Sequence, residues 1–426
     1  MRWVRKQCQD FGGSPHCTLI GGGQTAPDRA TLFNGALTRY LDFNDSYLAT
    51  GETCLPSDNL APVLAAAEYA DRGGRDVLTA LAVPYQVQCR LSDVAPVRAK
   101  GFDHTTQGSY AVAVGVSHAL GLDQAKTANA IAISGTAFNA LCVTRTGSLS
   151  HWKGLAYPNT ASCSTHAAFL AKRGITGPRE VFEGNKGFMD SIAGRFEIDW
   201  EKEGLERVKD TIIKKYNAEI HSQSAIEALL DLKHRYHLTA AEVDAIDAEI
   251  FRVAFNIIGG GEEGKRAAIR TKEDADHSLR YILAVSLLDD QVMPAQYDEA
   301  PIARADVQAL LERVRIRPDQ QLSKGFPQGM PCRLTVHLKD GRSLEVEKND
   351  YEGFHTRPAT WNVILKKFEQ LSEPHGSPRL EREIAGRVGE IDKIRIAELL
   401  ALLRSQNKRT RGLGIADRTG RRNNQQ

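Results

Sequence analysis

The sequence has almost no excess of charge of either sign. Lysine and arginine together number 55, and aspartate and glutamate 53, which leaves a net charge of +2 at pH 7. A balance this close gives no general electrostatic reason to expect nucleic acid as a partner. Any cationic binding site must therefore be local.

Long apolar runs are missing as well. The longest, residues 59–70 and 111–122, are interrupted by Glu, His or Gly well before the ~20 residues that cross a bilayer. Residues 1–6 are basic, but no apolar core or small-residue cleavage site follows them, unlike in a secretory signal. We therefore expect no transmembrane helix and a cytoplasmic location.

The sequence also lacks the motifs of metal and nucleotide sites. Its seven cysteines are scattered and never form Cys-x-x-Cys, so we expect reduced thiols and no zinc or iron–sulfur centre. No His-x-x-x-His or carboxylate pair combines ligand type with ligand spacing. The glycines at 21–23 do not form a Gly-x-Gly-x-x-Gly phosphate loop. We expect neither a metal nor a nucleotide cofactor.

Residues 29–172, approximately, are rich in Ala, Leu and Val at helical spacing. Gly and Pro separate these segments, and no short runs alternate apolar and polar residues as strands do. The apolar residues repeat every three or four positions in residues 62–71, 77–91, 109–120 and 124–136. This pattern predicts a bundle of buried helices. Its many Ala and Gly positions favour close helix packing, within an all-α core or at a dimer interface.

The pattern changes after Tyr216. Residues 222–236 have the spacing of an amphipathic helix, and residues 243–255 alternate as in a strand. Residues 334–338 alternate apolar and polar side chains, and the Asp340-Gly341 pair that follows is typical of a tight hairpin turn. A second, α+β domain is therefore predicted.

Helical patterns resume near the C-terminus, at residues 358–371 and 384–405, whereas residues 407–426 are polar, basic and without periodicity. We predict that this last segment is disordered. A chain of 426 residues is large for one compact core. The expected fold is therefore mainly α, with a large all-helical domain and a smaller α+β domain.

The first group of candidate site residues lies in residues 40–47, which are unusually polar for a link between apolar helices. Asp42, Asp45 and Ser46 could supply a proton acceptor and hydrogen bonds. Ser57 or Asp58 could cap a helix whose positive end favours an anionic ligand. The alternative, which sequence physics alone favours, is ordinary N-capping and a solvated turn.

His104 lies in residues 101–108, directly before an apolar helical pattern. Beside the amides of a first helical turn, a neutral imidazole could act as acid or base on an anionic substrate. A structural histidine, with Thr105 as helix cap, is an equal alternative. His118, within the same helix, is expected to be an ordinary core or surface residue.

Arg145 and Lys153 belong to a polar stretch, residues 144–154. Arginine binds a carboxylate through a bidentate fork, and lysine binds it as a point charge. For Arg145 alone, a solvent-exposed loop is the preferred interpretation. Lys153 follows Trp152, and a lysine held against an aromatic ring is expected to be partly buried.

Lys214 and His221 lie where the helical half gives way to the α+β part, and domain junctions are favoured places for ligand pockets. Their segment could bind a polycarboxylate, or it could be a plain helix start capped by Ser222. His277 precedes a helical pattern at residues 279–288, so it could face the pocket or merely help to start that helix.

Seven short strings occur together in the order found in the MmgE/PrpD family. They are residues 41–48, 56–59, 101–106, 152–154, 218–224, 276–281 and 336–342. The similarity covers about residues 13–371, and seven strings in register make chance an improbable source. The sequence therefore resembles MmgE/PrpD proteins, a group of cofactor-independent lyases that handle small polycarboxylates such as 2-methylcitrate and cis-aconitate.

The resemblance implies an all-helical domain at residues 1–214, an α+β lid at residues 215–351 and C-terminal helices at residues 352–406 that return to the helical domain. It also implies a homodimer formed through the helical parts. The active site would lie in the cleft between the helical domain and the lid.

Matched by motif position, the resemblance implies a set of catalytic residues: Asp42, Ser46, His104, Lys153 and Lys214. The residues expected to bind substrate are Arg145, His221 and His277. The implied reaction is loss of water from 2-methylcitrate or a related acid, with the two lysines binding carboxylates, His104 transferring a proton, and Asp42 orienting a partner or acting itself. Decarboxylation of cis-aconitate and epimerisation of an amino-dicarboxylate are alternatives on the same scaffold.

Two departures from the family pattern matter. Family members commonly carry His-Pro-Ser where this chain has Leu55-Pro56-Ser57, and leucine can neither exchange a proton nor donate a hydrogen bond. If that histidine carries catalysis, its loss could cost the ~10²–10⁴-fold typical of general acid–base catalysis. The chain also begins near the family's third or fourth helix, so we expect the opening helices to be absent. A catalytically impaired polycarboxylate-binding protein is therefore a third alternative.

Overall fold

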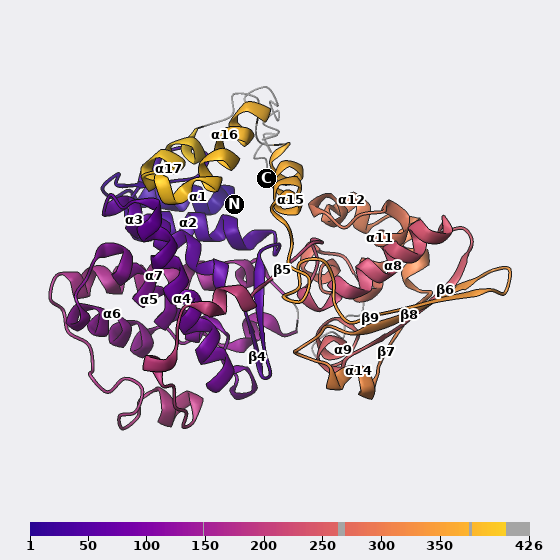
Figure 1. Ribbon diagram of the computed structural model, residues 1–426, viewed down its shortest axis with the longest axis horizontal. Helices are drawn as coiled ribbons and strands as arrows, with labels where there is room; N and C mark the ends of the chain where they lie inside the picture. The colour runs from indigo at the N-terminus through magenta and orange to yellow at the C-terminus, as the bar shows by residue number, and fades with distance from the viewer. Residues whose placement is uncertain (148, 263–268, 375–376, 406–426) are drawn as a thin grey trace, which may run out of the picture.

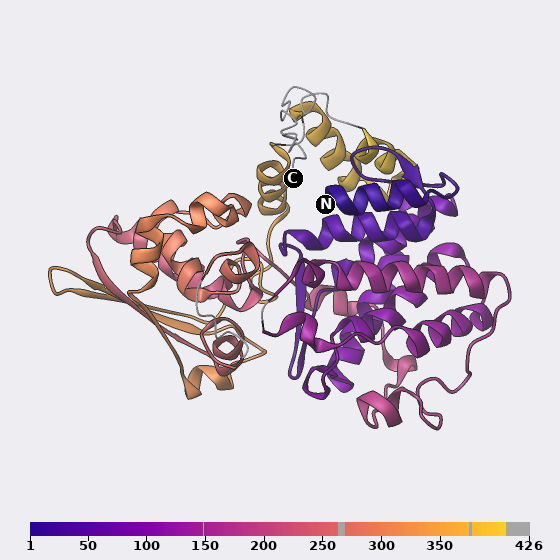
Figure 2. The same ribbon diagram turned by 180° about the vertical axis from the view of Figure 1, so that it is seen from behind.

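The computed structural model describes residues 1–147, 149–262, 269–374 and 377–405, and it has two lobes (Figure 1). One lobe is a helical bundle, and the other is built around a four-stranded sheet. The prediction of a large helical domain with a smaller α+β domain is confirmed. Seen from either side, the last two helices of the chain lie over the N-terminal ones (Figure 2).

The helical lobe is formed by the first half of the chain. Its helices are α1 (Arg2–Phe11), α2 (Pro27–Tyr40), α3 (Leu60–Tyr69), α4 (Gly74–Val94), α5 (Thr105–Leu120), α6 (Gln124–Ala137) and α7 (Ala156–Lys172). The four predicted helical segments all fall within α3 to α6, apart from two residues at the end of the first segment. Small residues bring these helices close together, because a Cβ on Gly108 of α5 would lie 2.4 Å from the ring of Tyr157 on α7.

Short strands occur in the helical lobe, where none was predicted. They are β1 (Cys17–Thr18), β2 (Gln24–Thr25), β3 (Asp45–Ala49) and β4 (Glu52–Cys54), with β5 (Ile212–Ile213) from the start of the second half. β3 is antiparallel to both β4 and β5. It is covered on both faces, so it lacks the apolar–polar alternation by which half-buried strands are recognised.

The second lobe, which we call the lid lobe, contains the rest of the sheet structure. Its elements are α8 (Gln223–Tyr236), β6 (Val243–Ile250), α9 (Arg252–Ile258), α10 (Lys272–Ala275), α11 (Leu279–Asp289), α12 (Glu299–Ile302), α13 (Ala305–Leu311), β7 (Val314–Pro318), α14 (Gln320–Lys324), β8 (Cys332–Leu338) and β9 (Ser343–Lys348). The strand order is β7-β6-β8-β9, with β6 parallel to β7 and the other neighbours antiparallel.

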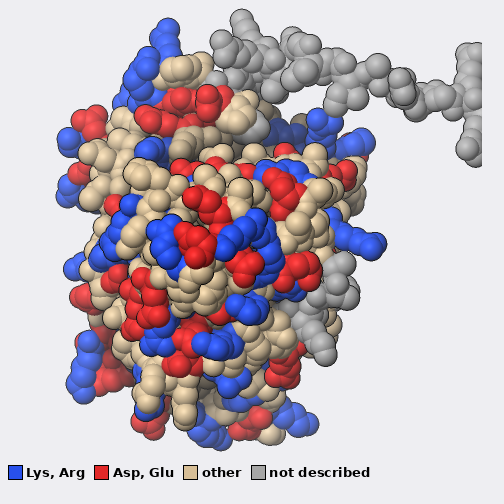
Figure 3. Space-filling view, turned by 90° about the vertical axis from the view of Figure 1, so that its right-hand side faces the viewer, with Lys and Arg blue, Asp and Glu red and all other residues tan. Residues whose placement is uncertain are grey.

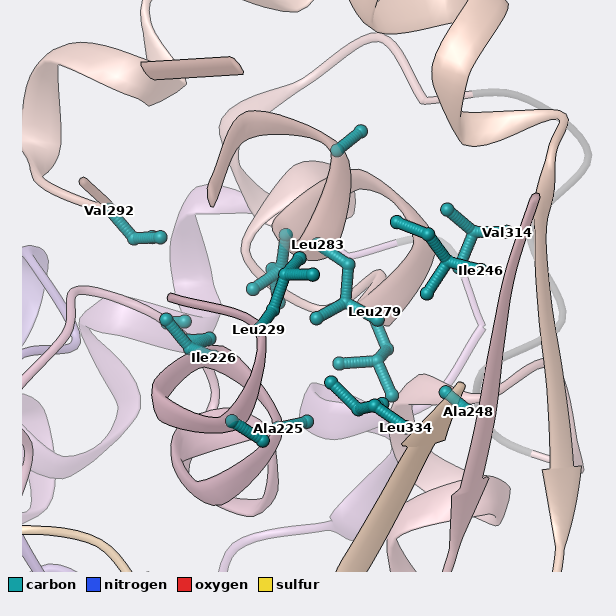
Figure 4. Packing of buried hydrophobic residues seen from close by; sticks show 14 of the residues in the cluster. Ala225, Ile226, Leu229, Ile246, Ala248, Leu279, Leu283, Val292, Val314 and Leu334 are labelled. Carbon is teal, nitrogen blue, oxygen red and sulfur yellow. The ribbon is translucent and has the colours of Figure 1, made fainter. Parts of the chain in front are cut away.

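One face of this sheet is buried and the other is charged. Leu229 of α8 and Leu283 of α11 pack with Ile246 of β6 in the core of the lobe (Figure 4). On the opposite face, cross-strand ion pairs such as Arg315–Asp247, 2.6 Å apart, alternate with the core residues. Acidic and basic side chains are interspersed over the lid end of the molecule (Figure 3), as the balanced composition suggests.

Three sequence predictions differ in detail from the structure. The strand predicted at 243–255 ends at Ile250, and α9 follows with its buried residues, Ala254 and Ile258, at the four-residue spacing of a helix. The predicted hairpin is present, but β8 and β9 are joined by four residues, of which Gly341 has a positive φ of 90° and Asp340 does not. The helix predicted at 384–405 is two helices.

The C-terminal segment runs from the lid lobe back across the molecule. Its helices are α15 (Trp361–Ser372), α16 (Pro378–Gly389) and α17 (Ile396–Arg404). α17 packs against α3, and Arg395 forms an isolated β-bridge with Gly73. The tail predicted to be disordered, residues 407–426, lies outside the described residues. Among the residues that are described, no helix combines the length and the apolar character needed to span a membrane.

Candidate active site

A cavity of about 250 Å³ lies between the two lobes. One wall belongs to the helical lobe and the β3–β4 hairpin, and the other to α9 and nearby loops of the lid lobe. All eight residues singled out in the sequence line it: Asp42, Ser46, His104, Arg145, Lys153, Lys214, His221 and His277. Segments that are far apart in the chain therefore meet at one site.

Asp42 lies at the centre of the helical wall because of how α2 ends. The helix stops at Tyr40, and Asp42 adopts a left-handed backbone conformation with a φ of 53°, which aspartate tolerates better than most residues. The chain then turns into β3. Because Asp45 pairs with Ile213 of β5, the next residue, Lys214, lies beside this turn. Strand pairing thus brings together Asp42 and Lys214, which are 172 residues apart.

The Asp42 carboxylate is held by three cations. Lys214 Nζ donates to Oδ1 at 3.0 Å, Arg39 Nη1 donates to the same oxygen at 2.9 Å, and Lys153 Nζ donates to Oδ2 at 3.3 Å. Burial alone would raise the pKa of Asp42, but Lys214, Lys153 and Arg39 outweigh it and hold the pKa well below its ordinary value. Asp42 is 8% exposed, so the interpretation of its segment as a solvated turn is wrong.

Lys153 connects Asp42 with the lid lobe. Its Nζ lies 2.9 Å from Nε2 of His277, whose Nδ1 contacts the carboxylate of Asp276. Burial lowers the pKa of Lys153, although Asp276 and Asp42 oppose that shift. Trp152 is half-exposed, and the contacts of Lys153 are to Asp42 and His277 rather than to the indole ring on which its burial was predicted.

Asp42, Asp276 and His277 are also the candidate metal ligands among the described residues. One ligand atom of each lies within 4.8 Å of the others. Lys153 Nζ is already in contact with Asp42 Oδ2 and the His277 ring. An ammonium group thus supplies the positive charge at the point where a divalent ion would need to bind, so the donor set does not fit a metal.

His104 and Arg145 form a second group on the helical wall. Arg145 binds Asp103 through Nε at 2.6 Å and Nη2 at 3.4 Å, and its Nη2 lies 3.3 Å from Nε2 of His104. Burial lowers the pKa of His104 to about 3, so its imidazole is neutral at physiological pH. The Arg145 side chain is only 7% exposed, which makes the solvent-exposed loop interpretation wrong. Asp103, rather than Thr105, accepts the bond from the first helical turn.

On the lid side, His221 is oriented by Glu219. The Glu219 carboxylate accepts from the His221 backbone amide at 2.8 Å and contacts Nδ1 of the ring at 2.7 Å. Burial opposes ionisation of Glu219, but the neighbouring His221 lowers its pKa to about 2. Ser222, the suggested helix cap, instead donates its hydroxyl to the Glu219 carbonyl.

Several polar atoms of the wall have no hydrogen-bond partner among the described residues, although they are buried. They are Arg39 Nε, Ser46 Oγ, Glu52 Oε1, His104 Nδ1 and His221 Nε2. Buried polar groups are normally satisfied, because an unmade hydrogen bond costs about 1–3 kcal/mol. Five such atoms on residues lining one cavity are therefore evidence that the cavity binds a polar ligand.

The cavity is also lined by residues that the sequence did not single out. The charged ones are Arg39, Glu52, Arg98 and Glu219, and Phe326 is among the apolar ones. Arg39 is inside a helix, and Glu52 and Arg98 lie outside the family strings, so no local pattern marked them. Glu219 lies inside a recognised string and could have been chosen. Leu55, at the position of the expected histidine, also faces this cavity.

Comparison with known proteins gives this geometry a context. The MmgE/PrpD N-terminal domain matches residues 1–201, and the MmgE/PrpD C-terminal domain matches residues 216–392. A 2-methylcitrate dehydratase from Cupriavidus necator is 28% identical over 387 residues, covering 85% of this chain and 78% of that protein. The Escherichia coli K12 2-methylcitrate dehydratase is 27% identical over 360 residues, covering 78% and 72%. A fungal alkylcitrate dehydratase is 27% identical over 382 residues, covering 81% and 73%.

Proposed function

The chain belongs to the MmgE/PrpD family, and from this membership we propose that it is a cofactor-independent hydro-lyase acting on a citrate-like polycarboxylate such as 2-methylcitrate. The relatives named as dehydratases of 2-methylcitrate and alkylcitrate support the reaction class. The site that carries it is the cavity between the lobes.

The observation that carries the proposal is the charge on the cavity wall. Its described part has five cationic side chains against three carboxyl groups: Arg39, Arg98, Arg145, Lys153 and Lys214 against Asp42, Glu52 and Glu219. A citrate-like acid brings two or three carboxylates, which this excess of positive charge complements. The atoms of Ser46, His104 and His221 that have no partner among the described residues offer further hydrogen bonds to carboxylate and hydroxyl oxygens.

Lys153 and Lys214 are the proposed carboxylate-binding groups. Both ammonium groups are buried and held in place by the Asp42 carboxylate, so they need little rearrangement when substrate binds. Removing a proton next to a carboxylate builds up negative charge on that carboxylate in the transition state. Preorganised cations in a site shielded from water stabilise such charge more than water does.

His104 is the proposed proton-transfer group. Burial keeps its imidazole neutral. The negative charge of a bound polycarboxylate would raise the pKa of His104 and favour uptake of the substrate proton. Arg145, fixed by Asp103, holds the ring from one side, and Nδ1 has no hydrogen-bond partner within the described part of the chain.

The test is to incubate the purified protein with 2-methylcitrate, citrate and close analogues, and to follow formation of the unsaturated product by its absorbance. We expect turnover by the wild type and a loss of ~10²–10⁴-fold in His104→Ala. His118→Ala, an exposed histidine on the same helix α5, is the matched control and should retain full activity. A wild-type signal no greater than that of His104→Ala would refute the hydro-lyase proposal.

The same incubations separate the other reactions of this scaffold. Release of carbon dioxide from cis-aconitate would identify a decarboxylase. Exchange of a substrate proton with deuterated solvent, without net loss of water, would indicate an epimerase. Tight binding of 2-methylcitrate without any of these changes would identify a binding protein.

A further inference from the structure

Glu52 is a buried carboxyl group of the cavity wall that has no part in the proton transfer described above. It lies on β4, whose pairing with β3 places Glu52 opposite Ala49. The residue is 3% exposed. A carboxyl group this deeply buried on a ligand-facing wall needs a physical explanation.

The two oxygens of Glu52 have different environments. Oε2 accepts hydrogen bonds from the backbone amides of Val97 at 3.3 Å and Arg98 at 3.1 Å. Oε1 is buried and has no hydrogen-bond partner among the described residues. One oxygen is thus fixed by the protein, and the other remains for a group that enters the cavity.

This arrangement suits an acid that gives up a proton. When Oε1 loses a proton, the resulting carboxylate is stabilised by the two amides already bound to Oε2, so no reorganisation is required. The charged side chains that act on Glu52 are Arg98 and Asp103. Arg98 favours the ionised form and Asp103 opposes it.

The protonation state is also appropriate. Burial raises the pKa of Glu52 to about 7, and Arg98 and the two amides offset only part of that effect. Asp42 and Glu219, the other carboxyls on the described part of the wall, have lowered pKa values and remain ionised. Glu52 is therefore the carboxyl of this wall that carries a proton in a large part of the molecules near neutral pH.

We propose that Glu52 is the general acid that protonates the departing hydroxyl group of the substrate. The proposal rests on the hydro-lyase function proposed above. The substrate C–H proton passes to the base, and the C–H electron pair forms the new double bond. The electron pair of the C–O bond leaves with the hydroxyl oxygen, which takes the proton from Glu52 Oε1 and departs as water. Glu52 is left as a carboxylate and regains a proton from solvent.

The decisive variant is Glu52→Gln, which keeps the shape and an oxygen that accepts from Val97 and Arg98 but has no acidic proton. With the hydroxy acid, we expect kcat to fall ~10²–10⁴-fold while KM stays within a few fold. The wild-type kcat should also decline as pH rises through the Glu52 pKa, and this decline should be absent in Glu52→Gln.

An analogue of the same acid with fluorine in place of the hydroxyl group separates an acid from a structural residue. Fluoride departs without needing a full proton transfer, so Glu52→Gln should process this analogue within about tenfold of wild type. Glu203→Gln, a half-buried carboxylate bonded to Arg90 outside the cavity, is the matched control and should behave as wild type with both substrates.

Each outcome has one meaning. If Glu52→Gln lowers kcat equally for the hydroxy acid and the fluoro analogue, Glu52 is not the general acid. The same conclusion follows if Glu52→Gln keeps wild-type turnover of the hydroxy acid. Wild-type protein that turns over neither compound would be a failure of the hydro-lyase function itself, and the acid role would fall with it.

Discussion

Replacing Asp42 by asparagine measures how far the candidate site depends on one buried carboxylate. Asparagine keeps the shape of the side chain but removes its charge. Lys214, Arg39 and Lys153 would then be left around a neutral amide, at positions 3.0, 2.9 and 3.3 Å from the present carboxylate oxygens. The lysine and arginine side chains are at most 9% exposed, so solvent cannot easily replace the lost partner.

The expected cost follows from these distances. Two unit charges 3 Å apart attract by about 5 kcal/mol at an effective dielectric constant of ~20, and desolvation of the pair cancels part of this. Removing one partner of a buried pair lowers stability by about 3–5 kcal/mol. Since Asp42 has three partners, we expect Asp42→Asn to lower the free energy of unfolding by at least about 3 kcal/mol at pH 7.

Asp58→Asn is the matched control, because Asp58 is equally buried but its cationic contact, Arg39 Nε, lies 3.8 Å away. Burial raises the pKa of Asp58 to about 7. Because the pKa of Asp58 is higher in the folded than in the unfolded protein, Asp58 stabilises the fold below pH 3.8, and this stabilisation is lost as pH rises through 7. The free energy of unfolding of Asp58→Asn should therefore increase relative to that of wild type from pH 5 to pH 8. The pKa of Asp42 is lowered instead, so its contribution to stability is complete above pH 3.8 and is lost only in stronger acid.

The assay is urea unfolding followed by far-ultraviolet circular dichroism at pH 5, 7 and 8. Asp42→Asn should cost the same at all three pH values, whereas the effect of Asp58→Asn should change with pH. Adding Lys214→Met to Asp42→Asn should recover part of the loss, because it removes one unpaired buried cation. An Asp42→Asn variant no less stable than Asp58→Asn at pH 7 would contradict the reasoning.

Two further changes test neighbouring parts of the site. Lys153→Met should lower kcat/KM for the hydroxy acid by ~10²–10³-fold, because transition-state charge stabilisation is lost. Replacing the exposed Lys172 by methionine should leave kcat/KM unchanged. Equal kcat/KM values for the two variants in steady-state assays would show that Lys153 has no part in the mechanism. Lys367 of α15 donates to the carbonyls of Phe43 and Lys214, and burial lowers its pKa to about 7 from 10.5. The free energy of unfolding of the wild type should therefore rise from pH 7 to pH 10, because in this range the unfolded chain binds a proton that the folded protein does not. Urea unfolding of Lys367→Met should show a smaller rise with pH. A rise as large as in the wild type would contradict the lowered pKa of Lys367.

The helical half of the fold could be predicted because its signal is local. Apolar residues recur every three or four positions, so the segment predicted at 124–136 agrees closely with α6. β3 could not be predicted, since a short strand buried on both faces has no alternation, and β4 has only three residues, too few to show a pattern. The break between α16 and α17 was missed because residues 384–405 keep a helical apolar pattern on both sides of it.

The candidate site was partly predictable for a different reason. Residues such as His104 and Lys153 belong to strings that can be recognised without knowing any contact. The three-cation environment of Asp42 could not be foreseen, because it depends on β5 pairing with β3, which brings Lys214 to Asp42 across 172 residues. Glu52 was missed for the same reason: its significance lies in its burial and in an oxygen that no described residue hydrogen-bonds, and only the tertiary structure determines both.

The distance in sequence between Asp42 and Lys214 also matters while the protein is being made. Translation at ~5–20 residues per second separates the emergence of the two by roughly 10–30 seconds, since they are 172 residues apart. During that time the nascent helical half carries the acid of the site without one of its main counter-charges. Water must solvate Asp42 until then, so this face of the nascent chain should stay hydrated and open until Lys214 is synthesised and β5 pairs with β3.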